Sequence, residues 1–354
     1  MDHLKQIAAR LPDHGVDAML CSSQPGEYYA VGINGEGYAL VAPAAARYIT
    51  DSRYTEAAEE AVTGAEVLTV SKGRGYADLI NEFTDAHSIK TLGVEEGYMT
   101  LAQYEGLKKA LHARLIPAGK LLAGLRAAKD EEELSRMLAA QRITDDAFTE
   151  ICGFIRPGMT EAEIAAKLTY EMLRRGAQRM SFDPIVASGP NGSRPHAIPG
   201  ARQVQRGEFI TMDFGCVYEG YCSDMTRTVA LGEVDEDKRR VYDTVLQAQL
   251  AGIAASRAGV PGKDIDDAAR AVIEAAGYGR FFGHGYGHSL GLEIHESPNA
   301  NARETAPLPV GAMVSAEPGI YIPGQFGVRI EDVVRMEEGG CTDITRSPKE
   351  LIIL

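Results

Sequence analysis

The sequence lacks the features that mark membrane, secreted and nucleic-acid-binding proteins. It contains no run of about 18 apolar residues to span a bilayer. Residues 1–15 are charged and lack the apolar stretch of a signal peptide. The five cysteines form no CxxC pair, which argues against a disulfide framework or a thiolate zinc site. The net charge of −14, without a dense run of Lys or Arg to neutralise phosphates, argues against nucleic-acid binding. We therefore expect a cytoplasmic protein with neither membrane nor nucleic acid as a partner.

The length predicts two domains, because a chain of 354 residues exceeds the usual domain size of about 100–200 residues. Residues 1–122 alternate helix-like stretches with short apolar runs, which is typical of an α/β domain. Residues 123–354 combine amphipathic helices with β-rich stretches and are better described as α+β. RPGMTEAEI at 156–164 is echoed by RAGVPGKDI at 257–265. Taken as more than chance, this echo predicts two related halves in the second domain.

Several elements can be placed from the sequence. Asp130 is expected to cap a long helix, and Thr160 with Glu163 forms a capping box for the next helix. In the first domain we expect helices at 1–12, 53–62, 76–87 and 100–112, and strands at Val16–Cys21, Tyr38–Val41, Glu66–Val70 and Thr91–Val94.

The stretch FFGHGYGHSLGLEIHE, residues 281–296, crowds three of the eight histidines among four glycines. A packed core does not require this composition, whereas a metal site or a proton-transfer site does. The glycines would let the backbone and a substrate approach such a centre closely. The remaining ligands must then come from elsewhere in the chain.

Two aspartates belong to a predicted hairpin at 207–231, with its turn at 219–220. This register places Asp213 opposite Thr226, and Asp224 then lies on the same face of the sheet, diagonally beside Asp213. Two carboxylates on one face repel each other unless a cation or a proton lies between them. The alternative is a pair of solvent-facing aspartates, which the apolar and β-forming neighbours disfavour.

The stretch 312–334 contains a second pair of acidic residues in a β-rich segment, Glu317 and Glu331. Glu317 ends one predicted strand, and Glu331 lies in VRIEDVV, which we interpret as an apolar strand. A glutamate in such a run needs a partner, because burying an unpaired carboxylate is costly. Arg329, two residues away on the same side, is one candidate, so a purely structural ion pair is the alternative to a metal ligand.

The donor set indicates a metal centre. Four carboxylates balance two divalent cations, and oxygen-rich sites with one imidazole suit Mn²⁺ or Co²⁺ better than a thiolate-preferring Zn²⁺. Bridging carboxylates hold two such ions about 3.5–4 Å apart, where a shared water becomes a nucleophile.

Five motifs, in this order, resemble those of the "pita-bread" metallopeptidases, which include methionine aminopeptidase, aminopeptidase P and prolidase. They are MDFG (212–215), SDMTRT (223–228), GHGYGHSLGLEIHE (283–296), AEPGIY (316–321) and VRIED (328–332). The N-terminal region, with ITDSRYTEAAEE (49–60), resembles the smaller domain of the prolidase and aminopeptidase P branch. The resemblance therefore implies a creatinase-like domain at 1–122 and a catalytic pita-bread domain at 123–354, with halves related by a pseudo-twofold axis.

The resemblance also assigns roles to residues. Its metal ligands correspond to Asp213, Asp224, His288, Glu317 and Glu331, and the metals would be two divalent ions, Mn²⁺ first, with Co²⁺ or Zn²⁺ as alternatives. Its catalytic positions correspond to His196, His295 and Glu317, the last as the base that takes a proton from water. Its substrate-binding positions correspond to His284 and Arg329.

The implied reaction is hydrolysis of an N-terminal Xaa-Pro bond in a di- or oligopeptide, by an enzyme of a branch that usually forms homodimers. The motifs do not separate a prolidase, which is an Xaa-Pro dipeptidase, from aminopeptidase P, which acts on longer peptides. The compact first domain favours the prolidase. A non-catalytic peptide-binding protein on the same fold is the alternative from another class, and the complete ligand set disfavours it.

Overall fold

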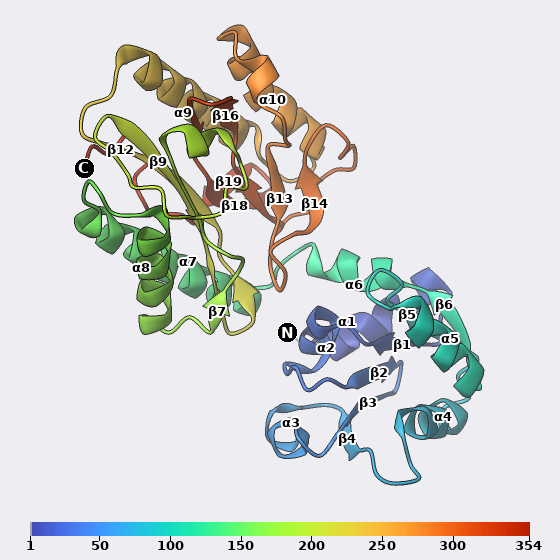
Figure 1. Ribbon diagram of the computed structural model, residues 1–354. Coiled ribbons are helices and arrows are strands. Elements are labelled where there is room, and N and C mark those ends of the chain that lie inside the picture. Colours follow the sequence, from blue (N-terminus) through green and yellow to red (C-terminus); the bar gives the residue numbers. More distant parts are fainter. Residues whose placement is uncertain (1) are drawn as a thin grey trace. The chain divides into compact units, whose positions relative to one another are not determined.

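A computed structural model describes residues 2–354, which form two compact units (Figure 1). The first unit ends at Arg126 and the second begins at Ala127. The boundary that we expected between residues 122 and 123 lies inside helix α6 (Gly119–Arg126). This helix buries Leu121 and Leu122, so the chain remains regular for four residues past the expected point. None of the described helices is long and apolar enough to cross a membrane.

The first unit is built on a six-stranded mixed sheet of order β4-β3-β2-β1-β5-β6. Strand β1 at its centre pairs antiparallel with β2 and parallel with β5. The predicted α/β class is therefore confirmed. The strands are β1 (Ala18–Cys21), β2 (Tyr38–Ala42), β3 (Ala45–Thr50), β4 (Glu66–Thr69), β5 (Thr91–Val94) and β6 (Arg114–Pro117). The helices besides α6 are α1 (His3–Arg10), α2 (Gln24–Val31), α3 (Thr55–Ala61), α4 (Tyr76–Ala86) and α5 (Leu101–Ala110).

Helix α2 is an element that the sequence reading missed, because Pro25-Gly26 is typical of a turn. Ser23 caps the helix, since its side chain accepts a hydrogen bond from the Gly26 amide. The buried carboxylate of Glu95 in turn accepts hydrogen bonds from the Ser22 and Ser23 amides and from the Ser23 hydroxyl. A long-range contact thus decides where this helix begins.

The second unit repeats one arrangement, a pair of helices followed by an antiparallel sheet (Figure 1). Helices α7 (Glu131–Phe154) and α8 (Glu161–Arg174) precede a sheet of order β12-β9-β8, and α9 (Glu236–Ala255) and α10 (Gly262–Ala275) precede a sheet of order β14-β13-β15-β18-β19. Helices α8 and α10 start 101 residues apart, the offset of the sequence echo. The predicted cap at Asp130 and the predicted capping box at Thr160 are both present, and Asp130 forms a capping box of its own with Glu133.

The strands of the second unit carry most of the site. They are β7 (Arg179–Met180), β8 (Ile185–Ser188), β9 (Glu208–Phe214), β10 (Cys216–Tyr218), β11 (Tyr221–Cys222), β12 (Met225–Leu231), β13 (Gly287–Ser289), β14 (Glu296–Ala300), β15 (Met313–Ala316), β16 (Gly319–Ile322), β17 (Phe326–Arg329), β18 (Asp332–Glu337) and β19 (Gly340–Asp343). The predicted hairpin register is confirmed, since Asp213 pairs with Thr226. Its turn has positive φ at both Glu219 and Gly220, as a two-residue hairpin loop requires.

One expected strand is wrong. VRIEDVV does not form a continuous strand, because β17 ends at Arg329 and β18 begins at Asp332, in a different sheet. Glu331 lies at this break, where its amide donates to the Thr226 carbonyl at 3.0 Å. The chain changes sheets here, so Arg329 and Glu331 do not share a strand face as the sequence suggested.

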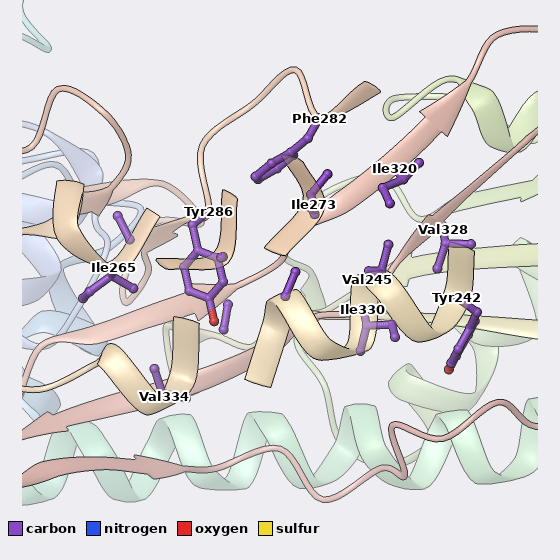
Figure 2. Packing of buried hydrophobic residues seen from close by; sticks show 14 of the residues in the cluster. Tyr242, Val245, Ile265, Ile273, Phe282, Tyr286, Ile320, Val328, Ile330 and Val334 are labelled. Atoms are coloured by element: carbon purple, nitrogen blue, oxygen red, sulfur yellow. The ribbon is translucent and has the colours of Figure 1, made fainter. Parts of the chain in front are cut away.

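A hydrophobic cluster packs helices α9 and α10 onto the strands of the second half (Figure 2). Val245 from α9 and Ile265 and Ile273 from α10 are fully buried in it, together with Tyr286 and Ile330. Apolar burial of this kind contributes about 25 cal/mol per Å². Tyr286 lies between His284 and His288 in the sequence, and Ile330 lies between Arg329 and Glu331. The cluster therefore anchors the backbone that carries these site residues.

Candidate metal centre

All nine residues singled out from the sequence line one cavity of about 350 Å³ in the second unit. They are His196, Asp213, Asp224, His284, His288, His295, Glu317, Arg329 and Glu331. They come from segments up to 135 positions apart (196 to 331), which the two sheets bring together.

The ends of strands position the four carboxylates. Asp213 lies in β9, and Asp224 immediately precedes β12, the strand paired with β9. Glu317 directly follows β15, and its amide donates to the Tyr286 carbonyl at 2.8 Å. Each carboxylate is thus held by ordered backbone.

His288 points a nitrogen lone pair at these carboxylates. Its Nδ1 lies 3.2 Å from the Ser289 carbonyl, which can only accept, so Nδ1 carries the hydrogen of the neutral ring. Nε2 then lies 3.3 Å from Glu317 Oε1 and 3.6 Å from Asp224 Oδ2. Burial lowers the pKa of His288 and favours this neutral form. A lone pair facing carboxylates is repulsive unless a cation lies between them.

The backbone before His288 approaches its neighbour strand too closely for any side chain. A Cβ on Gly287 would lie 1.9 Å from the Ser315 carbonyl oxygen. This proximity lets the Ser315 hydroxyl accept from the His288 amide at 3.0 Å and donate to Glu317 Oε1 at 3.0 Å. One serine therefore fixes two members of the site.

The carboxylates fit divalent metal ions. Asp213 Oδ1 and Asp224 Oδ1 are buried, and no residue in 2–354 donates a hydrogen bond to either atom. Asp224, His288 and Glu331 each present a ligand atom, and these three atoms lie within 4.8 Å of one another. Buried acceptors without donors are costly, and a cation among them removes that cost.

The raised pKa values of the buried carboxylates also indicate that the site is suited to a cation. Burial, followed by repulsion from Glu331 and Asp213, raises the pKa of Asp224 well above its ordinary value. Burial, followed by repulsion from Glu317 and Asp213, does the same to the pKa of Glu331. Burial also raises the pKa of Glu317. Without a cation, the charged forms are therefore disfavoured together.

Arg329 has a partner that the sequence reading did not foresee. Its Nη2 donates to Asp213 Oδ2 at 2.6 Å, rather than to Glu331 or Asp332. The guanidinium also donates to Thr226 Oγ1 at 3.0 Å, to the Tyr321 hydroxyl at 2.8 Å and to the Pro195 carbonyl at 3.5 Å. The buried guanidinium thus neutralises one carboxylate of the site.

The three other histidines of the cavity have different surroundings. His284 Nε2 lies 2.9 Å from the Tyr321 hydroxyl and Nδ1 lies 2.8 Å from the Gly285 carbonyl, and burial lowers the pKa of His284. His295 packs edge-on against His288 with ring centroids 4.4 Å apart. His196 and His295 are exposed, so they lie at the open side of the cavity.

The sequence reading missed three residues that hold the site together. Thr226 donates to Glu331 Oε2 at 2.7 Å, Tyr321 joins His284 to Arg329, and Ser315 joins His288 to Glu317. Thr226 and Tyr321 lie in motifs whose charged residues are the candidate ligands, and Ser315 directly precedes one of these motifs. The signal available for Thr226 was its spacing: it lies two residues after Asp224 and therefore on the same strand face.

The chain belongs to metallopeptidase family M24, which matches residues 135–338, and residues 3–128 match the creatinase/prolidase N-terminal domain. It is a peptidase of a family that uses divalent metals. It is 41% identical over 356 residues to the uncharacterized peptidase YqhT of Bacillus subtilis (strain 168), an alignment that covers 100% of this chain and 99% of that one.

Two solved structures share the whole architecture. An Xaa-Pro dipeptidase from Bacillus anthracis superposes with a TM-score of 0.96 at 38% identity, covering 100% of this chain and 99% of the other. An X-Pro aminopeptidase from Thermotoga maritima MSB8 superposes with a TM-score of 0.91 at 38% identity, covering 97% and 99%. The predicted family and fold class are thereby confirmed.

Proposed function

We propose that this chain is a dinuclear metal exopeptidase that hydrolyses N-terminal Xaa-Pro bonds, as a prolidase does. One observation carries the proposal: four carboxylates and one neutral imidazole converge in a cavity where two buried carboxylate oxygens accept no hydrogen bond from residues 2–354. The likeness to a dipeptidase over the whole chain supports the substrate class.

Asp213, Asp224, His288, Glu317 and Glu331 would hold the ions. The donor set favours Mn²⁺, with Co²⁺ or Zn²⁺ as alternatives. Divalent ions at such a site supply Lewis acidity toward water and a peptide carbonyl. The homodimer and the cytoplasmic location stay predictions, which rest on the resemblance and on composition.

The protein's own groups handle the protons. Glu317 accepts a proton from water. His295 and His196 lie at the open side of the cavity. They stabilise the negative charge that develops on the substrate carbonyl oxygen when water attacks, and they hold a proton that this oxygen takes up. His284, held by Tyr321, faces the substrate. The proline nitrogen of the intact substrate carries no hydrogen, so the site needs no acceptor for it. When the C–N bond breaks, this nitrogen takes up the proton that Glu317 received from water, while the hydroxide oxygen stays on the Xaa carboxylate.

A specific observation favours the second candidate, an Xaa-Pro aminopeptidase. A dipeptidase must recognise the free carboxylate of proline, and Arg329, a substrate-binding position by the resemblance, is the arginine of the cavity that could bind it. Arg329 is instead paired with Asp213, and the cavity's other cationic candidates are its histidines. An aminopeptidase leaves this side open for a longer chain.

The test uses metal-stripped protein with Ala-Pro, Ala-Pro-Ala and Ala-Ala. Chelation should abolish hydrolysis, Mn²⁺ or Co²⁺ should restore it, and Ala-Ala should stay uncut. Preference for Ala-Pro over Ala-Pro-Ala supports the prolidase, and the reverse supports the aminopeptidase. Binding of these peptides with no hydrolysis under any metal would identify a peptide-binding protein instead.

A further inference from the structure

Arg227 uses all five of its N–H donors inside the protein. Nε donates to the Pro348 carbonyl at 2.9 Å, and Nη1 donates to the carbonyls of Thr226 at 2.9 Å and Glu331 at 2.5 Å. Nη2 donates to Asp332 Oδ1 at 2.6 Å and to the Ser347 carbonyl at 2.7 Å. Its side chain is 1% exposed, and this set of contacts joins three separate stretches of chain.

Asp332 is the acidic centre of the same cluster. Its Oδ2 accepts from Gln249 Nε2 at 2.6 Å and pairs with Lys349 Nζ, which also donates to Asp343 Oδ2 at 2.6 Å. Asp332 is fully buried, so its charge depends on these cations. None of these groups lines the metal cavity.

The segment 345–354 closes the cluster from the other side. Asp145 accepts from the Ser347 amide at 2.9 Å and from its hydroxyl at 2.6 Å. Ile353 then bridges in parallel to Ala230 of β12. The segment is therefore fixed to the second unit at both ends.

The cluster touches the two strands, β12 and β18, that directly follow the metal-ligand candidates Asp224 and Glu331. Arg227 lies three residues after Asp224 in β12, and Asp332 follows Glu331 directly. The Glu331 backbone is held on both sides, with its amide on the Thr226 carbonyl and its carbonyl on Arg227. Glu331 sits at the break between two sheets, where ladder pairing does not fix its position.

We propose that the Arg227–Asp332 pair, closed by Lys349 and the segment 345–354, is a positioning device that sets the affinity of the metal centre through Glu331 and Asp224. This inference rests on the proposed metal site. Partners behind metal ligands typically change metal affinity about 10–100-fold when they are altered. The device acts through the backbone of Glu331 rather than through its carboxylate, which Thr226 holds.

The experiment titrates Mn²⁺ into the metal-stripped full chain by calorimetry. The variants are Asp332→Asn, Arg227→Lys and Lys349→Met, the last a milder change because the Lys349 side chain is 21% exposed. Glu171→Gln in α8 is the matched control, since Glu171 is a buried carboxylate paired with Lys167 and Arg174. Unfolding free energies are measured in parallel.

We expect Mn²⁺ affinity to fall about 10–100-fold in Asp332→Asn and Arg227→Lys, less in Lys349→Met, and not in Glu171→Gln at comparable loss of stability. Native affinity in all three variants would overturn this inference alone, as would an equal loss in the control. Absence of Mn²⁺ binding by the native chain would instead overturn the proposed metal centre and this inference with it.

Discussion

At the residue scale, the four cavity histidines are chemically distinct. His288 has its Nδ1 occupied by a carbonyl and its Nε2 facing two carboxylates, whereas His295 and His196 are exposed at the open side. This difference matches the proposed roles. A metal ligand needs an unprotonated nitrogen held in a fixed position beside the carboxylate ligands, whereas a proton-transfer group does not.

We expect His288→Ala to lose metal, and His295→Ala and His196→Ala to keep metal while the rate falls about 10²–10⁴-fold. Metal content by emission spectrometry and kcat on Ala-Pro check this division. His112→Ala, at an exposed position in the first unit, is the control and should change neither quantity. Equal metal loss in the three cavity variants contradicts the assignment.

Arg329 illustrates how a neighbour in sequence is not always a neighbour in space. Removing it leaves the Asp213 carboxylate buried without its counter-charge, and breaking a buried pair costs about 3–5 kcal/mol. Arg329→Ala should therefore destabilise the metal-free protein and lower kcat/KM for Ala-Pro and Ala-Pro-Ala by similar factors. Arg329→Lys, which keeps the charge, should lose less. A selective loss on Ala-Pro would restore the carboxylate-binding role to Arg329.

At the scale of elements, helix α10 holds the glycine-rich loop that presents His284. Arg270 donates to the His284 carbonyl at 2.8 Å and to the Phe282 carbonyl at 3.1 Å, and it pairs with buried Asp266. Asp266 accepts from the Tyr286 amide at 2.8 Å. The Tyr286 ring is packed in the hydrophobic cluster, so the loop is fixed at its far end as well (Figure 2).

We expect Arg270→Met to lower the free energy of unfolding by about 1.5–3 kcal/mol, because charged hydrogen bonds to the loop are lost. Metal content should persist, since His288 is held by pairing of β13, while KM for Ala-Pro should rise as His284 becomes mobile. Denaturant titration and steady-state kinetics measure the two effects.

Arg240→Met is the control for this substitution. Arg240 forms an exposed pair with Asp237 on α9, and such pairs contribute about 0–1 kcal/mol. It should leave KM unchanged. An unchanged KM in Arg270→Met as well would show that α10 supports stability only.

At the scale of the whole molecule, metal binding should be linked to pH and confined to one unit. The raised pKa values of Asp224, Glu317 and Glu331 mean that the metal-free folded chain retains protons that the unfolded chain has lost. Its stability therefore falls as pH rises through those raised values. The lowered pKa of His288 acts with opposite sign, but only below the ordinary imidazole value of about 6.5.

Mn²⁺ must displace the protons that these carboxylates retain, so the rise in melting temperature on adding Mn²⁺ should be larger at about pH 8 than at about pH 6.5. A ligand at 100 times its Kd stabilises by about 2.7 kcal/mol. Hydrogen exchange should slow in β9, β12 and β13 and not in β1 or β5. Equal stabilisation at both pH values, or protection in the first unit, contradicts this expectation.

Local patterns in the sequence were sufficient to predict most of the helices, strands and turns of this protein. Capping residues, the 219–220 turn and the apolar periodicities depend on neighbours a few positions apart, and most of the predicted elements are present. Eight of the nine residues singled out from the sequence lie in the five ordered motifs, and all nine line the cavity, because a metal site is expected to need particular side chains at particular strand ends.

Tertiary structure alone decided which of those side chains pair. Arg329 is two residues from Glu331, yet the break between β17 and β18 separates them, and hydrogen bonds between the Arg329 backbone and Thr228 aim the guanidinium at Asp213. The anchoring of Glu331 by Arg227 likewise depends on sheets that meet from distant parts of the chain. Period and spacing indicate which face a residue occupies only within one continuous strand, whereas the breaks between strands and the partners across a face are set by the packing of whole sheets.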